Sequence, residues 1–324
     1  MKPEKLISVV VLNYNGIHHL DGCLSSLQKQ TYKNYEVIVV DNGSKDGSQE
    51  FVKTNFPFAS LVCLDQNYGF CKGNNEGIKV SKGEYVVLLN NDTFVESEWL
   101  KNLYVCINSD EHIGFCASKM ILYNNREFLD SAGDGFAICG AGYKRGHLEK
   151  ASEYIKDEYV FGASGGAVIY KREMLDKLGL LDEDFFAIYE DVDLSFRAQI
   201  AGYKCKFASK AVVYHKVNAT IGAMSDFYVY HGQRNAEYVY FKNMPGKLMI
   251  RTMFPHLLYN FLAFGYFLLK GKGLVFVKAK FDFLRNFKTV LQKRKRIQAE
   301  KTVDDSSLLS LFERRWMETR IRGK

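Results

Sequence analysis

The first ninety residues alternate apolar runs of strand length with segments of helical periodicity. Apolar residues recur at helical spacing from Ile17 to about Thr31, and short helices are predicted over 48–55 and 69–81. Runs without polar alternation are typical of parallel strands covered on both faces. Four such runs separate the helices: Leu6–Asn13, Tyr35–Val40, Ser60–Leu64 and Glu84–Leu89. This strand and helix order predicts an open α/β sheet with right-handed crossovers.

Polar residues close the predicted strands, and ligands of such sheets bind beyond the carboxyl ends of the strands. Asp92 lies in the Asn90–Thr93 stretch that closes the fourth strand, where a carboxylate suits Mg²⁺ or Mn²⁺ together with phosphate oxygens. Asp41 closes the second strand and could accept the ring N–H of uracil or thymine. For both residues the alternative is a polar turn or helix cap.

Two common nucleotide-binding motifs are missing from the sequence. Residues 13–18 read Asn-Tyr-Asn-Gly-Ile-His where a dinucleotide fold needs GxGxxG, and no GxxxxGK[ST] occurs. A bound polyphosphate would therefore need a metal ion or basic side chains.

Acidic residues also begin a predicted helix further along the chain. Glu190, Asp191 and Asp193 follow an aromatic and acidic turn, and Asp193 forms an i,i+4 pair with Arg197. They could simply complement the helix dipole, but three acids are more than a cap requires, which favours a carboxylate acting as general base. His215 ends a short apolar strand, 212–215, and a lone histidine in such a place is often structural.

Seven segments, in the same order, resemble the family 2 glycosyltransferases of the GT-A fold, and among them the rhamnosyltransferase-like branch. They span about 7–224, some two-thirds of the chain. The matching segments are SVVVLNYNG, YEVIVVDNGSKDGS, NYGFCKGNNEGI, GEYVVLLNNDT, FGASGGAVIYKREML, GLLDEDFFAIYEDVDLSFR and VVYHK. The resemblance implies a Rossmann-like nucleotide-diphospho-sugar transferase domain.

The resemblance also implies a role for each matching residue. Asp191 stands where the family has its catalytic base, with Glu190 beside it. Asp92 ends the counterpart of the DxD motif, and His215 matches a metal or diphosphate contact of some relatives. The nucleotide sugar would contact Asn13, Asn15, Asp41, Asn67, Gly69, Asn75, Asn90 and Asn91, with Lys72 in place of an arginine that many members have at Asn74. Asn90 replaces the first acid of DxD, so Asp92 is the motif's single carboxylate.

The function implied is an inverting, metal-dependent hexosyltransferase that needs Mg²⁺ or Mn²⁺. One base and one displacement give inversion. The donor would be a dTDP- or UDP-sugar, with dTDP-rhamnose favoured, and the acceptor a hydroxyl of a lipid-linked or polysaccharide glycan in cell-surface glycan synthesis. A non-catalytic scaffold that keeps the fold is the alternative, and a sugar nucleotidyltransferase is the other enzyme considered.

Charge is distributed unevenly along the 324 residues, whose net charge is +7. From Lys242 onward the chain has 19 Lys and Arg against 6 Asp and Glu. Ten aromatic residues lie between Phe254 and Phe287, and the apolar segment Met253–Leu269 is shorter than the roughly 20 residues of a spanning helix. Aromatic and basic residues together favour peripheral binding to an anionic membrane surface. A helical subdomain packed on the enzyme or on a second subunit is the alternative.

The remaining features concern compartment and domains. The seven cysteines are scattered, and the first ten residues do not resemble a signal peptide, so we expect a reduced cytoplasmic setting, on the cytoplasmic face of the plasma membrane. No nucleic-acid-binding motif accompanies the basic residues. We expect a GT-A domain over 1–222, divided into a nucleotide-sugar half, 1–115, and an acceptor and catalytic half, 116–222, followed by a helical basic region, 223–324.

Overall fold

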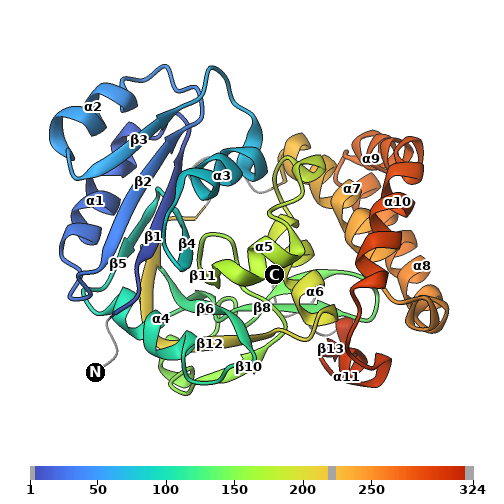
Figure 1. The fold of residues 1–324 in the computed structure, drawn as a ribbon. Helices are drawn as coiled ribbons and strands as arrows, with labels where there is room; N and C mark the ends of the chain where they lie inside the picture. Colours follow the sequence, from blue (N-terminus) through green and yellow to red (C-terminus); the bar gives the residue numbers. More distant parts are fainter. Residues whose placement is uncertain (1–3, 218–223, 318–324) are drawn as a thin grey trace.

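The computed structural model describes residues 4–217 and 224–317 and is built around one large mixed sheet (Figure 1). Eight strands lie in the order β10-β12-β6-β11-β4-β1-β2-β3, and β5 and β7 pair at its margins. The parallel part, β3-β2-β1-β4, is the predicted sheet, whereas β11 runs antiparallel to both β4 and β6. The strands are β1 Ile7–Asn13, β2 Tyr35–Asp41, β3 Ala59–Cys63, β4 Tyr85–Asn90, β5 Thr93–Val95, β6 Ile113–Leu122, β7 Leu129–Ser131, β10 Glu158–Val160, β11 Ala167–Lys171 and β12 Lys204–His215.

The register of the parallel strands places their polar ends along one edge. Asn13 at the end of β1 pairs with Asp41 at the end of β2, and Leu12 pairs with Asn90 at the end of β4. The prediction that Asp41 and Asp92 lie at carboxyl ends of parallel strands is therefore confirmed.

Apolar helices cover both faces of the sheet. One core joins the sheet to α1, α2 and α4, and a second core joins its other face to α3, α5 and α6. Because both faces are covered, the strands of the parallel part carry the near-continuous apolar runs seen in the sequence. These helices are α1 Ile17–Gln28, α2 Ser48–Asn55, α3 Gly69–Val80, α4 Trp99–Ile107, α5 Arg172–Leu178 and α6 Glu190–Ile200.

A helical region follows and packs against α6 and the second core. Its helices are α7 Asp226–Asn243, α8 Gly246–Leu269, α9 Gly273–Arg285, α10 Phe287–Ala299 and α11 Asp305–Ser310. The last described strand, β13 (Phe312–Glu313), joins β8 (Asp134–Ala137) and β9 (Gly142–Lys144) in a small second sheet, so the chain returns to the body of the molecule. Two short 3₁₀ helices, η1 Ala151–Glu153 and η2 Glu183–Phe185, complete the elements.

Buried ion pairs hold this region in place. Lys242, with 2% of its side chain exposed, lies 2.6 Å from Asp182 and 2.7 Å from Asp193. Asp193 also accepts from Arg197 at 2.9 Å, as the sequence spacing predicted. Lys280 pairs with Glu237 at 2.6 Å, and 21% of its side chain is exposed. Several cations of the basic region thus neutralise acids of the fold.

The structure corrects one expectation about length. Met253–Leu269 was expected to be too short to span a membrane, but α8 continues unbroken from Gly246 through Pro255 to Leu269, over 24 residues. Within the described residues it is the one helix long and apolar enough for a membrane span by length and composition, and only 11% of its apolar window is buried. The predicted domain boundary at 222/223 falls outside the described residues.

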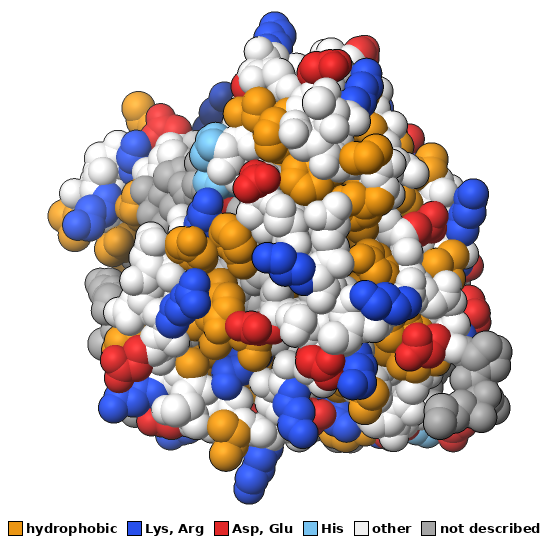
Figure 2. All heavy atoms as spheres, turned by 90° about the vertical axis from the view of Figure 1, so that its left-hand side faces the viewer, with side chains coloured by type: hydrophobic (Ala, Val, Ile, Leu, Met, Phe, Trp, Pro, Cys, Tyr) orange, Lys and Arg blue, Asp and Glu red, His pale blue; other side chains and the backbone are white. Residues whose placement is uncertain are grey.

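The surface differs from one side of the molecule to another. Figure 2 shows the face that carries α1 and α2, where Lys and Arg side chains are interspersed with Asp and Glu. Large exposed apolar side chains gather instead on α8 and α9, which lie at the opposite side of Figure 1. The excess of Lys and Arg over Asp and Glu in the basic region therefore does not extend over this face of the nucleotide-sugar half.

Candidate active site

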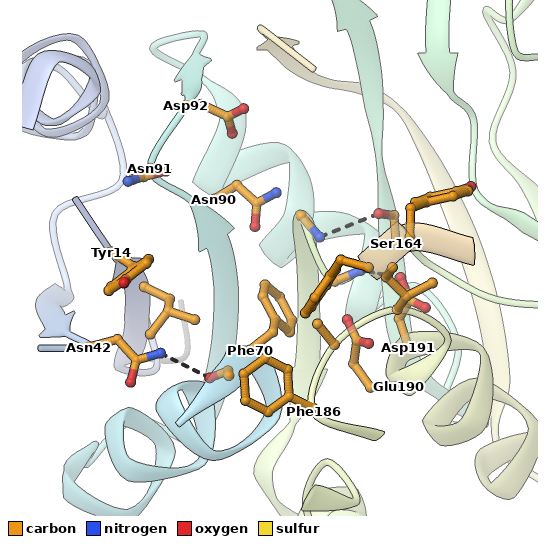
Figure 3. A pocket seen from close by; sticks show the side chains of 18 of the residues that line it. Tyr14, Asn42, Phe70, Asn90, Asn91, Asp92, Ser164, Phe186, Glu190 and Asp191 are labelled. Atoms are coloured by element: carbon orange, nitrogen blue, oxygen red, sulfur yellow. Dashed lines mark hydrogen bonds between the residues drawn. The ribbon is translucent and has the colours of Figure 1, made fainter. Parts of the chain in front are cut away.

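A cavity of about 700 Å³ opens at the carboxyl edge of the parallel strands. Its polar residues come from the ends of β1, β2 and β4, and its opposite wall comes from the loop before α6 and from the first turn of α7 (Figure 3). This volume is in the usual range for small-molecule sites. The lining residues include Leu12, Tyr14, Asn42, Asn67, Gly69, Phe70, Asn90, Asn91, Asp92, Lys144, Ser164, Gly165, Gly166, Phe186, Ala187, Ile188, Glu190, Asp191, His215, Ser225, Phe227 and Tyr228.

Asp92 and His215 form a pair at one side of the cavity. Asp92 Oδ1 lies 3.2 Å from His215 Nε2, and His215 Nδ1 lies 2.8 Å from Asp130 Oδ2. Burial opposes the charge on His215, but the two carboxylates outweigh it and raise the pKa of the imidazole to about 9. Burial likewise opposes the charge on Asp92, yet the hydrogen bond and charge of His215 leave its pKa below the ordinary value. Both partners are therefore charged near neutral pH, and a cation bound between them would replace the proton on His215 Nε2.

The pair fits a divalent cation. A carboxylate oxygen and an imidazole nitrogen converge at the cavity wall, and the second imidazole nitrogen is held by Asp130, as in many metal sites. Within 4–217 and 224–317, no group of three or more His, Cys, Asp or Glu side chains could hold a metal. Mg²⁺ and Mn²⁺ commonly use one or two protein ligands and take the rest from phosphate and water, so the pair is sufficient only together with a phosphate-bearing ligand.

Glu190 and Asp191 lie at the opposite side of the cavity from Asp92 (Figure 3). Asp191 accepts hydrogen bonds from the backbone N–H of Gly165 at 3.0 Å and of Val192 at 2.8 Å. Glu190 Oε2 is buried without a hydrogen-bond partner in the part of the chain that the structure describes. Burial raises the pKa of both carboxyls, and the charge of Asp191 raises that of Glu190 further. Backbone donors favour the ionised form of Asp191, so Glu190 is the better holder of a proton shared between them.

The loop before the two acids has an unusual backbone. Phe186, Ile188 and Tyr189 have φ of 64°, 71° and 75°. Such conformations cost about 1–3 kcal/mol each and persist only where neighbouring groups hold them. The side-chain amide of Asn235 on α7 supplies three of these contacts, donating to the carbonyls of Phe185, Ala187 and Ile188 at 3.0, 2.9 and 2.7 Å.

Two glycines allow the cavity walls to approach one another. Gly69 has φ of +83°, and a Cβ there would lie 2.6 Å from the carbonyl oxygen of Phe186. A Cβ at Gly165 would lie 3.2 Å from the Phe70 ring and 3.6 Å from Asp191 Cβ. Gly69 is thus where α3 meets the strained loop, and Gly165 separates Phe70 from Asp191.

Several residues predicted from the sequence meet at this cavity. Asn67, Gly69, Asn90, Asn91, Asp92, Glu190, Asp191 and His215 all line it. The structure thus brings together residues from four separate segments, which span 148 positions of the sequence from Asn67 to His215. Their roles in binding and catalysis stay predictions.

Other predicted residues lie behind the cavity wall. Asn13 donates to Asp41 Oδ2 at 3.1 Å and accepts from Asn91 at 2.7 Å, so it joins the ends of β1, β2 and β4. Asp41 is 1% exposed and also accepts from Ser44 N–H and from Gln49. Asn15 accepts from the backbone N–H of Lys45 at 2.8 Å, which shapes the same turn.

Two predicted contacts point elsewhere. Asn75 donates to Leu181 O at 2.9 Å and to Glu183 at 3.0 Å, so in this structure it ties α3 to the segment before α6. The ammonium of Lys72 lies over the ring of Tyr68, 3.8 Å from its centre. Neither residue lines the cavity, and both remain untested as nucleotide contacts.

Some lining residues were not singled out from the sequence. Tyr14, Asn42 and the Ser164–Gly166 turn lie inside the recognised segments, so their neighbourhood was a usable signal. No such signal in the sequence marked Lys144, which lines the cavity, or Asp130, which lies behind His215. Asp130 is 85 residues from His215 in the chain. Lys144 Nζ lies 2.6 Å from Asp130 Oδ1, a contact that only the fold creates. Phe227 and Tyr228 were placed in the basic region, yet α7 brings them to the cavity.

Solved structures with a similar fold include glycosyltransferases of the GT-A fold. GalNAc-T7 with UDP, GalNAc and Mn²⁺ superposes with a TM-score of 0.60 at 17% identity, covering 75% of this chain and 51% of that one. The mannosyltransferase PcManGT from Pyrobaculum calidifontis, in complex with GDP-Man and Mn²⁺, gives 0.55 at 16% identity, covering 92% and 86%. S. aureus TarS in complex with UDP gives 0.51 at 22% identity, covering 73% and 66%. The protein therefore has a GT-A fold with a C-terminal helical region.

The chain belongs to the family described as Glycosyl transferase family 2, which matches residues 8–179, more than half of its length. Among curated proteins, the glycosyltransferase GlyG of Streptococcus pneumoniae is 37% identical over 31% of this chain and 35% of its own length. The poly-beta-1,6-N-acetyl-D-glucosamine synthase of Staphylococcus epidermidis is 26% identical over 67% of this chain and 52% of its own. The chain thus spans about a third to a half of these two relatives.

Proposed function

We propose that this chain is an inverting, metal-dependent hexosyltransferase that moves a sugar from a nucleotide-diphosphate donor to a glycan hydroxyl in cell-surface glycan synthesis. The observation that carries the proposal is one cavity lined on one side by the Asp92–His215 pair and on the other by Glu190 and Asp191. A cation site for a leaving diphosphate and a base for the incoming hydroxyl are the two parts that this reaction requires.

Asp191 would be the general base. Its carboxylate is oriented by the N–H groups of Gly165 and Val192, which leave it facing the cavity, so it can take the proton of an acceptor hydroxyl. Its pKa, raised by burial, brings the base closer to working pH and favours proton transfer. A single displacement on the face opposite the leaving group then inverts the anomeric centre.

Asp92 and His215 would hold the donor diphosphate through Mg²⁺ or Mn²⁺, which neutralises charge that grows as the diphosphate departs. Two of the similar structures contain Mn²⁺. Asp130 fixes the ring orientation of His215 from behind, at 2.8 Å.

We propose that the nucleoside of the donor carries a uracil or thymine base. An ionised carboxylate offers about four acceptor positions, and Asp41 uses three of them on Ser44, Gln49 and Asn13. The remaining position, on Oδ2, suits a ring N–H once the turn after β2 opens, because Asp41 is 1% exposed and lies behind the cavity wall. The resemblance of the sequence favours dTDP-rhamnose, whereas two similar structures hold UDP, so a UDP-sugar is the alternative donor.

The site geometry also favours an enzyme over a scaffold that keeps only the fold. Glu190 Oε2, which is buried and meets no hydrogen-bond partner among the described residues, and three strained residues before it lower stability. A scaffold gains nothing from such features, whereas an active site needs them.

A panel of dTDP- and UDP-sugars, measured by calorimetry with Mg²⁺ and again with EDTA, tests the proposal. We expect one donor to bind only with the metal, and Asp92→Ala to weaken that metal-dependent binding. Asp41→Ala should mainly remove the preference for uracil or thymine over cytosine. Equal affinity in EDTA would contradict the metal site, and no binding of any donor would favour the scaffold.

We also propose that α8 and α9 attach the enzyme peripherally to the cytoplasmic face of the plasma membrane, where a lipid-linked or polysaccharide acceptor would be presented. Ile250, Phe254, Leu257 and Phe261 recur at helical spacing along α8 and are 81%, 75%, 59% and 73% exposed. A second row of exposed apolar residues at helical spacing lies on α9 and consists of Leu274, Val277, Phe281 and Leu284. Each Lys or Arg close to an anionic leaflet adds about 1 kcal/mol to the free energy of membrane binding. Salt partly screens this attraction.

Flotation with phosphatidylglycerol vesicles tests this attachment on the full chain. A truncation near Lys242 would remove buried partners of Asp182 and Asp193, so point variants are preferable. Phe254→Ser with Phe261→Ser should abolish flotation, while Val105→Ser with Ile155→Ser, exposed at 61% and 66% elsewhere, should not. Equal flotation of both variants would refute the surface, and wild-type protein that resists carbonate extraction would refute peripheral binding.

A further inference from the structure

The cavity has an aromatic wall that the donor chemistry does not use. We define it as Phe70, Phe186, Phe227 and Tyr228, all of which line the cavity. Phe70 packs at the Gly165 position beside Asp191, and Phe186 precedes Glu190 in the strained loop. Figure 3 places Phe70 and Phe186 between the Asn42 end of the cavity and the two acids.

The outer part of the wall comes from α7. The rings of Phe186 and Phe227 lie 5.9 Å apart, and His231 lies against both, with ring centres at 5.5 and 4.3 Å. Despite this packing, Phe227 is 37% exposed and Tyr228 is 46% exposed. The side chain of Ser225 caps α7 by accepting from Tyr228 N–H at 3.1 Å, which fixes the first turn at the cavity.

We infer that the aromatic wall is the acceptor subsite, and that Phe227 and Tyr228 pack against the apolar C–H face of a pyranose ring of the acceptor glycan. This inference rests on the proposed function, because it takes Asp191 as the base. An acceptor hydroxyl must come within hydrogen-bond reach of the base, about 2.6–3.2 Å, so the rest of its sugar ring must lie along the wall nearest Asp191. The aromatic wall reaches Asp191 through Phe70, at the Gly165 position, whereas the Asn42, Asn67 and Asn90–Asp92 side offers polar groups to the nucleotide.

The position of the wall in the fold adds a second reason. α7 is held from outside by α9: Lys272 pairs with Asp226, and Tyr230 donates to Asp282 at 2.8 Å. The helix α9, which carries part of the exposed apolar residues, therefore also supports the start of α7. An acceptor presented near a membrane surface would meet Phe227 and Tyr228 on its way to Asp191.

Saturation-transfer NMR on the full-length protein tests the inference. The probes are the methyl glycosides of glucose, galactose, N-acetylglucosamine and rhamnose, with Mg²⁺ and UDP or dTDP present in the same sample. We expect at least one glycoside to receive saturation at its ring C–H protons, and Phe227→Ala to weaken its binding about tenfold, the loss of one good aromatic contact. Nucleotide signals should stay unchanged.

Matched variants distinguish the loss of the aromatic ring from a general loss of packing or folding. Phe227→Leu keeps apolar packing but removes the flat face, so it should behave like Phe227→Ala, while Phe227→Trp should retain binding. Phe58→Ala, 39% exposed and outside the cavity, should have no effect. Glycoside binding that is absent, or that persists in Phe227→Leu and Tyr228→Ala, overturns the acceptor subsite. Loss of the nucleotide signals from wild-type protein would instead contradict the proposed function.

Discussion

Asn235 offers the sharpest test of how the helical region serves the active site. It is fully buried on α7, and its side-chain N–H groups bond three carbonyls of the loop that leads to Glu190 and Asp191. Asn235→Ala removes all three bonds. Phe185 O also accepts from Arg234, at 3.1 Å, so the change falls mainly on the carbonyls of Ala187 and Ile188.

The expected magnitude follows from those contacts. A buried carbonyl that loses its partner costs about 1–3 kcal/mol, so we expect unfolding in urea to become easier by about 3 kcal/mol. The strained residues Phe186, Ile188 and Tyr189 would relax and shift the loop before Asp191. A misplacement of about 1 Å costs roughly 10²-fold in rate, so kcat should fall 10- to 100-fold with donor affinity nearly unchanged.

Asn243→Ala is the control for Asn235→Ala. Asn243 is equally buried on the same helix, but it donates to Asp193 at 2.8 Å and has no bond to the loop. It should lower stability and leave kcat within about twofold. If Asn235→Ala lost only stability, or if both variants lost the same activity, Asn235 would be a packing residue and the loop would need another clamp.

Two further predictions concern the loop and the paired acids. Gly69→Ala should destabilise the fold by more than Gly179→Ala. Both glycines have φ near +82°, but only a Cβ at Gly69 meets another group, Phe186 O at 2.6 Å. Urea unfolding of the two variants isolates that clash, and equal losses of stability would refute it. Glu190→Gln should stabilise the protein increasingly as pH rises from the ordinary glutamate value of about 4.3 toward the raised pKa, because folded Glu190 holds a proton that the unfolded chain releases. The variant gains on the wild type because wild-type stability falls as pH rises through that window. A stability difference between Glu190→Gln and wild type that stays constant with pH would show that Glu190 is ionised in the fold.

Much of the fold was predictable from local pattern. The apolar runs of β1, β2 and β4 are buried on both faces, and the polar residues that end them meet because parallel strands share a direction. The antiparallel insertion of β11 between β4 and β6 was not predictable, since a five-residue apolar strand has no sign of its direction.

The site was predictable in part, for a physical reason. Asp92 and Asp191 stand in recognisable segments, whereas Asp130 and Asn235 act through contacts that span 85 and 47–50 residues of sequence. Asn75 and Lys72 look like nucleotide contacts by position, yet the fold uses one to tie α3 to Leu181 and places the other on Tyr68. Sequence position located the edge of the sheet, and side-chain direction then decided which residues reach the cavity.

Single-turnover sugar transfer by Asp191→Asn tests the central claim most directly. The substitution keeps the shape of the side chain, removes its ability to take a proton, and leaves the donor side around Asp92 untouched. With the donor identified by calorimetry, we expect the rate of transfer to fall about 10²–10⁴-fold while donor affinity changes by less than about twofold. Transfer at more than about a tenth of the wild-type rate would contradict the account, because the base would then lie elsewhere.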